Sequence, residues 1–311
     1  MSLSFFPDGV ENPANLARIH DAASLFGGSC SLSIEGRLIA VENAAGARDI
    51  YGRRPLRGDA TLAVGNERRG LSRKTLAAAD EVVVIPMQSR TITTLNVAAA
   101  AAVAAWYVLR GSGPQARAQR PEARRPSLLI AGEDHVEVGS SLRSAAAFGF
   151  HDVLLEDRGA GWFDGPSAVR REARAAARRH KNPLRVHRAR LDSAARYEQI
   201  VLVTPSGPGT PLQREGLTHG NRQLIIVGAS LDELGASATD RVRVATLGLE
   251  TVQSVPLRLI ASIMLAEVAR QVGRRHPVPG LAGRFPRYEK ALAPMPPGDV
   301  LLVESSDLLA F

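Results

Sequence analysis

The chain has 311 residues, which is enough for about two domains with buried cores. Hydrophobic residues make up 45% of it and charged residues 23%, and these values exclude a collagen-like or wholly disordered chain. The single Cys30 excludes an intrachain disulfide, and residues 1–7 lack the features of a signal peptide, so we expect a cytoplasmic protein. The formal charge of +8, carried mainly by arginine, favours a polyanionic partner such as RNA or DNA.

The first part of the chain alternates helical and strand patterns. Apolar periodicity predicts helices over Leu16–Phe26 and Leu71–Ala78, and short apolar runs predict buried strands over Ala60–Val64 and Val82–Ile85. The alanine-rich run Val97–Leu109 predicts a buried helix that a partner helix can approach closely. This run is shorter than the roughly 20 residues of a membrane-spanning helix. We therefore expect an α/β first domain.

The remaining chain contains a linker, a second α/β domain and a tail. Residues 111–126 contain three prolines and lack apolar periodicity, as is typical of a linker between a domain at 1–110 and one at 127–273. Residues 274–311 are rich in Pro, Gly and Arg, and we expect a tail that wraps the surface or adds an edge strand. In the second domain the patterns predict strands over Ser127–Ile130, Val153–Leu155, Ile200–Val203 and Leu224–Val227, and helices over Ser140–Phe148, Ser167–Arg179 and Leu257–Val268.

A weak internal repeat connects the two halves. Three landmarks occur in the same order in each: a helix that ends in Phe-Gly, a strand that ends at glycine, and a short polar segment before an apolar helix. This order favours a duplication, although two generic α/β halves could share such features by chance. The paired segments are Asp21–Gly27 with Arg143–Gly149, Leu62–Gly65 with Ile225–Gly228, and Thr94–Asn96 with Ser254–Pro256.

Three motifs in the first half carry candidate chemistry. They are DGVENPANLARI from Asp8, VGNERRGLS from Val64, and VVVIPM from Val82 followed by TLNVAAAAA. The loop that begins at Gly65 leads from a strand into a helix, so a ligand can approach its backbone amides. It matches neither a P-loop nor a dinucleotide fingerprint, and a plain turn is the alternative. Asn15 is either a functional side chain or the N-cap of the first helix.

Together, these ordered motifs resemble the SPOUT superfamily, specifically its SpoU/TrmH-type RNA ribose methyltransferases. The resemblance covers nearly all of residues 3–110 and extends less closely over 127–273. It implies an α/β fold with a trefoil knot that holds S-adenosylmethionine, here duplicated as a fused pseudo-dimer. It further implies a catalytic centre with Asn15, Glu67, Asn96 and Arg143, and contacts to the methyl donor from Gly65, Asn66, Ile85, Met87, Thr94 and Leu95.

The two halves depart from the family pattern in complementary ways. Asp21 stands where the family has an arginine important for catalysis, whereas Arg143 keeps that arginine in the second half. Glu137 and Pro256 replace the asparagines of the second half. We therefore expect one composite site, in which the first half binds the donor and Arg143 holds an RNA phosphate and stabilises developing alkoxide charge. Loss of Arg143 should then abolish transfer and spare donor binding. The alternative is that Arg143 pairs with a local acid, Glu137 or Glu133.

The expected reaction is methylation of a ribose 2′-hydroxyl of tRNA or rRNA by a monomer. The segment Arg170–Arg190 has nine Lys or Arg residues against the single acid Glu172, and on a helix it would form a basic surface for RNA phosphates. A solvated helix face is the alternative. No metal is expected, because the histidines lack ligand spacing. A non-catalytic RNA-binding protein and a base methyltransferase remain the competing functions.

Overall fold

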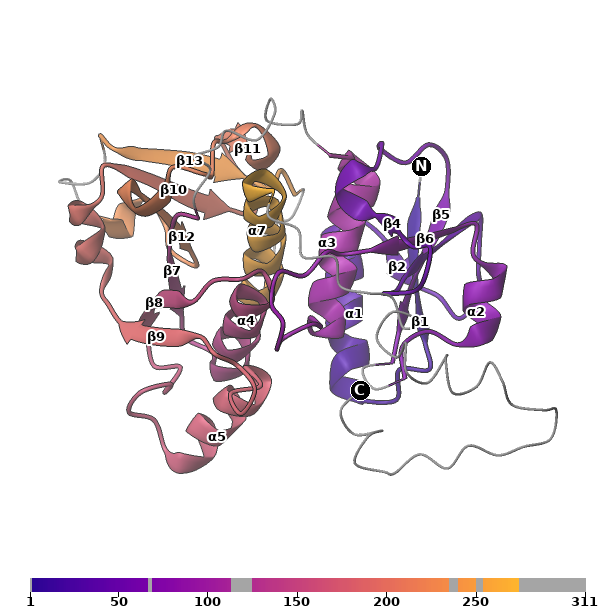
Figure 1. Cartoon of the computed structure of the whole chain (residues 1–311), viewed down its shortest axis with the longest axis horizontal. Helices are drawn as coiled ribbons and strands as arrows, with labels where there is room; N and C mark the ends of the chain where they lie inside the picture. The colour runs from indigo at the N-terminus through magenta and orange to yellow at the C-terminus, as the bar shows by residue number, and fades with distance from the viewer. Residues whose placement is uncertain (1, 67–68, 113–124, 235–239, 250–253, 274–311) are drawn as a thin grey trace, which may run out of the picture.

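The protein contains two parallel β-sheets that flank a central layer of helices (Figure 1). The computed structural model describes residues 2–66, 69–112, 125–234, 240–249 and 254–273. Within these ranges, no helix is both long and apolar enough to cross a bilayer.

The first half forms a six-stranded sheet in the order β2-β1-β5-β3-β6-β4, and every strand pair is parallel. Strand β5, ATLAVG, lies at its centre and is buried along most of its length, as its continuous apolar run predicts. The strands are β1 (Leu3–Asp8), β2 (Ser29–Cys30), β3 (Arg37–Val41), β4 (Arg48–Asp49), β5 (Ala60–Gly65) and β6 (Glu81–Val84). The helices are α1 (Pro13–Leu25), η1 (Ile50–Gly52), α2 (Arg73–Ala78) and α3 (Val97–Arg110).

The second half forms a seven-stranded parallel sheet in the order β11-β13-β10-β12-β7-β8-β9. Its strands are β7 (Ser127–Gly132), β8 (Asp152–Asp157), β9 (Arg185–Arg188), β10 (Gln199–Thr204), β11 (Thr210–Pro211), β12 (Gln223–Val227) and β13 (Val242–Thr246). Its helices are α4 (His135–Ala147), α5 (Ser167–Ala176) and α7 (Leu257–Val272), with short 3₁₀ turns η2 (Leu191–Arg196), η3 (Leu212–Arg214), η4 (Gly220–Arg222) and η5 (Asp232–Leu234).

The two halves have the same connectivity. Read from the other end, the second sheet begins with β9 and then runs β8-β7-β12-β10-β13-β11. These last six strands match β2-β1-β5-β3-β6-β4 strand for strand and in chain order. The second half adds α5 and β9 between β8 and β10. The Phe-Gly landmarks coincide as well, because Phe26 and Phe148 both end 13-residue helices and are followed by Gly27 and Gly149 with φ of +65° and +80°.

The central helices pack the halves into one core. Helices α3 and α7 contact each other, α1 packs on α3, and α4 packs on α7. The alanines of α3 give it a narrow surface, which allows the close approach of α7. A single hydrophobic cluster extends from Phe5 in the first sheet to Ile225 in the second. The outer face of the first sheet forms a separate small cluster around Leu38, against which Leu76 of α2 packs.

A buried polar contact also joins the halves across α3 and α7. The hydroxyl of Tyr107 donates to Glu267 Oε2 at 2.8 Å, and both side chains are fully buried. Glu267 also accepts from Arg270 and from Gln271, so the carboxylate is well satisfied. Such a network specifies one arrangement of the two helices.

The expected strands and helices are present, with two corrections. The sequence patterns missed seven strands, most of them short or at a sheet edge: β1, β2, β3, β4, β9, β11 and β13. The basic segment Arg170–Arg190 is not one helix, because α5 ends at Ala176 and Arg178 takes a left-handed φ of +50°. Asn182 Nδ2 then donates to the carbonyl of Ala177, which stabilises the turn. Residues 113–124, most of the linker expected at 111–126, and the tail from 274 lie outside the described residues.

Candidate functional site

The glycine loop after β5 folds back on itself. Asn66 and Gly70 exchange backbone hydrogen bonds of 3.1 and 2.8 Å. A Cβ on Gly65 would lie 2.3 Å from the carbonyl carbon of Gly70 and 2.4 Å from the nitrogen of Leu71, so only glycine allows this close approach. Of the predicted site residues here, Asn66 donates through Nδ2 to the carbonyl of Gly9 at 2.8 Å. Glu67 lies outside the described residues.

Two carboxylates that the sequence analysis missed hold this loop in place. Asp8 Oδ2 accepts from the backbone nitrogen of Ser72 at 2.7 Å, and Glu42 Oε2 accepts from that of Leu71 at 2.8 Å. Partial burial opposes ionisation of Asp8, but hydrogen bonds from Ser72 and Thr75 lower its pKa below the usual value. Asp8 ends β1 and Glu42 directly follows β3, and this position at the carboxyl ends of parallel strands is the signal that could have identified them.

The loop between β6 and α3 carries most of the other predicted residues. Ile85, Met87 and Leu95 are buried there. Asn96 is the N-cap of α3, since its Oδ1 accepts from the backbone nitrogen of Ala98 at 3.0 Å. The capping role of Asn96 restricts its side chain to the start of the helix.

Arg143 of the second half reaches into this loop of the first. Its Nε donates to the carbonyl of Thr94 at 3.0 Å, and its Nη2 donates to Thr94 Oγ1 at 2.9 Å and to the carbonyl of Leu95 at 2.8 Å. The residue is only 8% exposed. A buried guanidinium that binds main-chain carbonyls fixes their positions, because hydrogen bonds from a charged donor are short and strong.

The other end of the same loop also rests on the second half. The carbonyl of Ala147, at the end of α4, accepts from the backbone nitrogens of Gln88 and Ser89 at 2.8 and 3.1 Å. Gln88 Nε2 donates to the carbonyl of Ala269 on α7 at 3.1 Å. The second half therefore determines the conformation of the loop at both ends.

The structure decides two points about Asn15 and Glu137 that the sequence left open. The N-cap of α1 is Asn12, whose Oδ1 accepts from the nitrogen of Ala14, and Asn15 instead lies buried inside the first turn, 3.4 Å from Arg18 Nη1. Glu137, one of the two acids expected as a local partner of Arg143, forms its ion pair with Arg258.

The equivalent position of the second half is filled by protein side chains. A Cβ on Gly132 or Gly228, at the ends of β7 and β12, would lie 2.8 or 2.9 Å from a methyl group of Leu257. Beside it, Arg258 is tied to Glu137, and burial, together with the positive charge of Arg18, lowers the pKa of Arg258 to about 10. Among the residues that the structure describes, protein side chains therefore occupy this position of the second half.

The basic segment of the second half lies next to the first-half loop. A cavity of about 450 Å³ is lined by Thr91 of that loop and by a turn that follows α5, with His180 and Lys181 among its residues. Part of the Arg170–Arg190 segment therefore lies beside the candidate site despite the early end of α5.

Comparison with known protein families finds a match over part of the first half. Residues 32–106 match the SpoU rRNA Methylase family. This SpoU segment contains the glycine loop, the end of β6 and the loop up to Asn96, whereas Asn15 and Arg143 lie outside it. No curated protein matches the chain significantly.

Several solved structures are similar to the chain at low identity. An rRNA methyltransferase from Sinorhizobium meliloti is 13% identical, with 70% of this chain and 73% of that one covered and a TM-score of 0.39. The SpoU methyltransferase AviRb from Streptomyces viridochromogenes is 15% identical over 83% of this chain and 89% of its own, with a TM-score of 0.37. A TrmH/SpoU tRNA modifying enzyme from A. aeolicus is 11% identical over 61% and 87%, with a TM-score of 0.37.

Proposed function

We propose that the protein is an S-adenosylmethionine-dependent RNA methyltransferase that modifies a ribose 2′-hydroxyl of tRNA or rRNA. The observation that carries this proposal is the SpoU segment, which contains both loops of the candidate site. The common connectivity of the two sheets supports a duplicated SPOUT fold, in which the knot and the pseudo-dimer remain part of the proposal.

The residues present fit the methyl donor. The absence of a side chain at Gly65 keeps backbone groups accessible beside the loop that turns back at Gly70. Ile85, Met87 and Leu95 provide an apolar wall, and the carbonyl of Leu95 can accept a second hydrogen bond beyond that from Arg143. Backbone groups at Gly65, Ile85 and Leu95, supported by Asn66 and Thr94, would hold the donor.

Positioning is the main contribution expected of the protein. S-adenosylmethionine supplies a methyl group on a sulfonium, and transfer to a ribose hydroxyl requires in-line alignment of the reacting atoms. Arg143 keeps the Thr94–Leu95 backbone in place, so we assign it to positioning the donor loop. In the proposed composite site, the first half contributes the donor-binding residues and the second half holds their loop in position. Asn15, Glu67 and Asn96 are the proposed polar groups around the ribose.

The RNA is proposed to enter beside Thr91. His180 and Lys181 line the cavity there, and further arginines follow on the same segment. Cationic side chains at this point would bind backbone phosphates in a salt-dependent manner.

Calorimetric titration with S-adenosylmethionine tests the donor site. We expect one site per chain, because Leu257 and the Arg258–Glu137 pair fill the second-half position. Asn96→Ala should weaken binding, because the cap of α3 next to Leu95 is lost. Asn12→Ala is the matched control, since Asn12 and Asn96 each cap a helix by accepting from the nitrogen two residues on, and each loss should cost about 1 kcal/mol of stability.

Alkaline hydrolysis of the RNA product tests the ribose assignment. A methylated 2′-oxygen blocks cleavage at that nucleotide, whereas base methylation leaves it cleavable. A folded wild-type protein that binds RNA but neither binds the donor nor transfers a methyl group would contradict the proposal and identify a non-catalytic RNA-binding protein.

A further inference from the structure

A second cavity, lined by arginine, lies at the amino ends of the strands of the first sheet, whereas the glycine loop lies at their carboxyl ends. Its volume is about 820 Å³, within the range of ligand pockets. Arg37 and Arg48 begin β3 and β4, and Glu81 begins β6, so the cavity lies at the amino ends of these strands. Arg37 is in register with Ala60, five residues before Gly65, which separates the two ends by roughly 16 Å.

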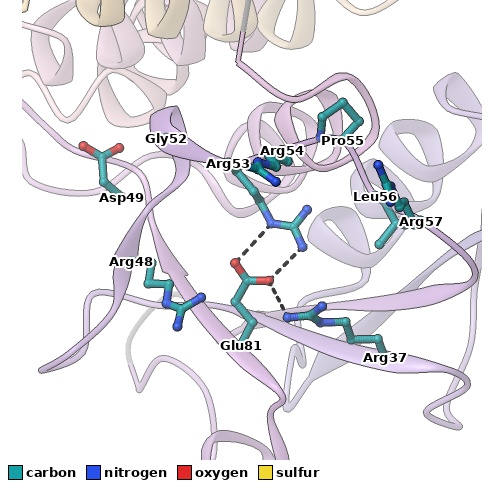
Figure 2. A pocket seen from close by; sticks show the side chains of 10 residues that line it. All are labelled: Arg37, Arg48, Asp49, Gly52, Arg53, Arg54, Pro55, Leu56, Arg57 and Glu81. Carbon is teal, nitrogen blue, oxygen red and sulfur yellow. Dashed lines mark hydrogen bonds and ion pairs between the residues drawn. The ribbon is translucent and has the colours of Figure 1, made fainter.

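Positive charge dominates the cavity. Five arginines line it, Arg37, Arg48, Arg53, Arg54 and Arg57, against two carboxylates. Both carboxylates are already engaged: Glu81 accepts from Arg53 and Arg37, and Asp49 accepts from the backbone nitrogen of Tyr51 at 2.8 Å. Figure 2 shows the carboxylate of Asp49 directed away from Glu81.

Three of the arginines have no ion pair with any other residue that the structure describes. These are Arg48, Arg54 and Arg57, all of which are exposed. The guanidinium group of arginine presents several N–H donors in one plane, and their spacing matches the oxygens of a phosphate. Several guanidinium groups without an ion pair around one cavity therefore favour a phosphate ligand.

Arg53 provides an independent observation that points to a ligand. Its side chain is 9% exposed, and its Nε and Nη2 bind Glu81 at 3.3 and 2.8 Å. Its Nη1 is buried and has no hydrogen-bond partner among the described residues. In Figure 2 this third nitrogen points away from Glu81. A buried guanidinium nitrogen without an acceptor is costly, and a bound oxyanion would satisfy it.

We propose that this cavity binds phosphate, and that its natural source is the backbone of an RNA strand. The proposal rests on the proposed function for the identity of the RNA, but the phosphate chemistry follows from the arginines themselves. Because the cavity and the glycine loop lie at opposite ends of the strands, the bound RNA must follow the protein surface for roughly 16 Å or more. The cavity would thus hold a part of the RNA remote from the modified nucleotide.

The test compares RNA binding by two double variants of the full chain. Arg48→Gln/Arg54→Gln removes two open guanidinium groups from the cavity. Arg196→Gln/Arg222→Gln is the matched control, because it removes the same charge from two exposed arginines of the second half. Binding of a fluorescently labelled RNA hairpin is measured by anisotropy over a range of salt concentrations.

The cavity variant should bind the hairpin about tenfold more weakly than the wild type, with a salt dependence reduced by about two phosphate contacts. Its affinity for S-adenosylmethionine should not change, which separates failure of this inference from failure of the proposed function. If the cavity and control variants bind the hairpin equally well, the proposal is wrong.

Titration with inorganic pyrophosphate distinguishes the two sources of phosphate. Arg53→Lys keeps a positive charge beside Glu81 but lacks the fork, so we expect pyrophosphate affinity to fall about fivefold while the protein stays folded. Loss of pyrophosphate binding in the cavity variants with unchanged hairpin binding would overturn the RNA assignment in favour of a free phosphate compound.

Discussion

Arg143 Nη2 lies 2.9 Å from Thr94 Oγ1, so a side chain of the second half holds a loop of the first. The same guanidinium binds the carbonyls of Thr94 and Leu95, which belong to the proposed donor site. The sequence alone led us to expect that donor binding survives the loss of Arg143. The observed contacts lead to the opposite expectation.

Arg143→Ala should weaken S-adenosylmethionine binding at least tenfold, because three hydrogen bonds that fix the donor loop are lost and each is worth about 1.5 kcal/mol or more. Arg143→Lys should recover part of the affinity, since one ammonium can replace some of these contacts. Arg158→Ala is the control, because Arg158 binds the carbonyl of Gly228 in the second half at 3.3 Å. Calorimetry of the three variants checks this, and full donor affinity in Arg143→Ala would contradict it.

Gly65→Ala should abolish donor binding and destabilise the first half by about 1–3 kcal/mol, because the new Cβ would overlap the backbone of Gly70 and Leu71. Gly52→Ala is the matched control, since a Cβ there meets no atom within 4 Å and φ is not in the left-handed region. Urea unfolding and donor titration of both variants provide the measurement. Equal stability and equal donor affinity of the two variants would show that the close contact of Gly65 with the backbone of Gly70 and Leu71 is not required.

Tyr107→Phe should lower the free energy of unfolding by about 1–3 kcal/mol, because the fully buried Glu267 loses a hydrogen-bond donor. Tyr197→Phe, at a partly exposed position, should change it by less than about 0.5 kcal/mol. Urea unfolding of the two variants beside the wild type is the measurement. Similar midpoints for all three would mean that the α3–α7 hydrogen bond contributes little.

Alkaline pH should destabilise the protein through the same tyrosine. Burial and the negative charge of Glu267 raise the pKa of Tyr107 above its ordinary value of 10.0. The folded state therefore holds the proton more tightly than the unfolded state, and this stabilisation is present below pH 10.0 and is lost as pH rises above it. The free energy of unfolding should fall more steeply above pH 10.0 in the wild type than in Tyr107→Phe. Parallel curves for the two proteins would contradict the assignment.

Lys181→Ala should weaken RNA binding several-fold and reduce its salt dependence by about one phosphate contact, because Lys181 lines the cavity beside Thr91. Donor affinity should stay the same. Lys74→Ala on α2 is the control, since Lys74 is exposed on the other side of the first sheet. Anisotropy with labelled RNA at several salt concentrations is the measurement. If the two variants lose the same RNA affinity, the RNA does not bind beside Thr91.

Much of the fold could be predicted from local patterns. The apolar run of β5 and the alanine run of α3 are long and continuous, so their type was clear. Strand β3 begins with an arginine, and its short apolar run was missed. The end of α5 was missed because the arginines of the segment favour a helix, whereas the chain turns at Arg178.

The sequence by itself determined the longer apolar strands, most helices and the family resemblance, because these depend on residues close together in the chain. Only the tertiary structure decided the hydrogen-bond partners of Arg143, the ion pair of Glu137 with Arg258, and the position of five arginines around one cavity. Each of these joins residues that are far apart in the chain. A contact of this kind depends on how strands and helices are ordered in space, and neither side-chain periodicity nor local propensity encodes that order.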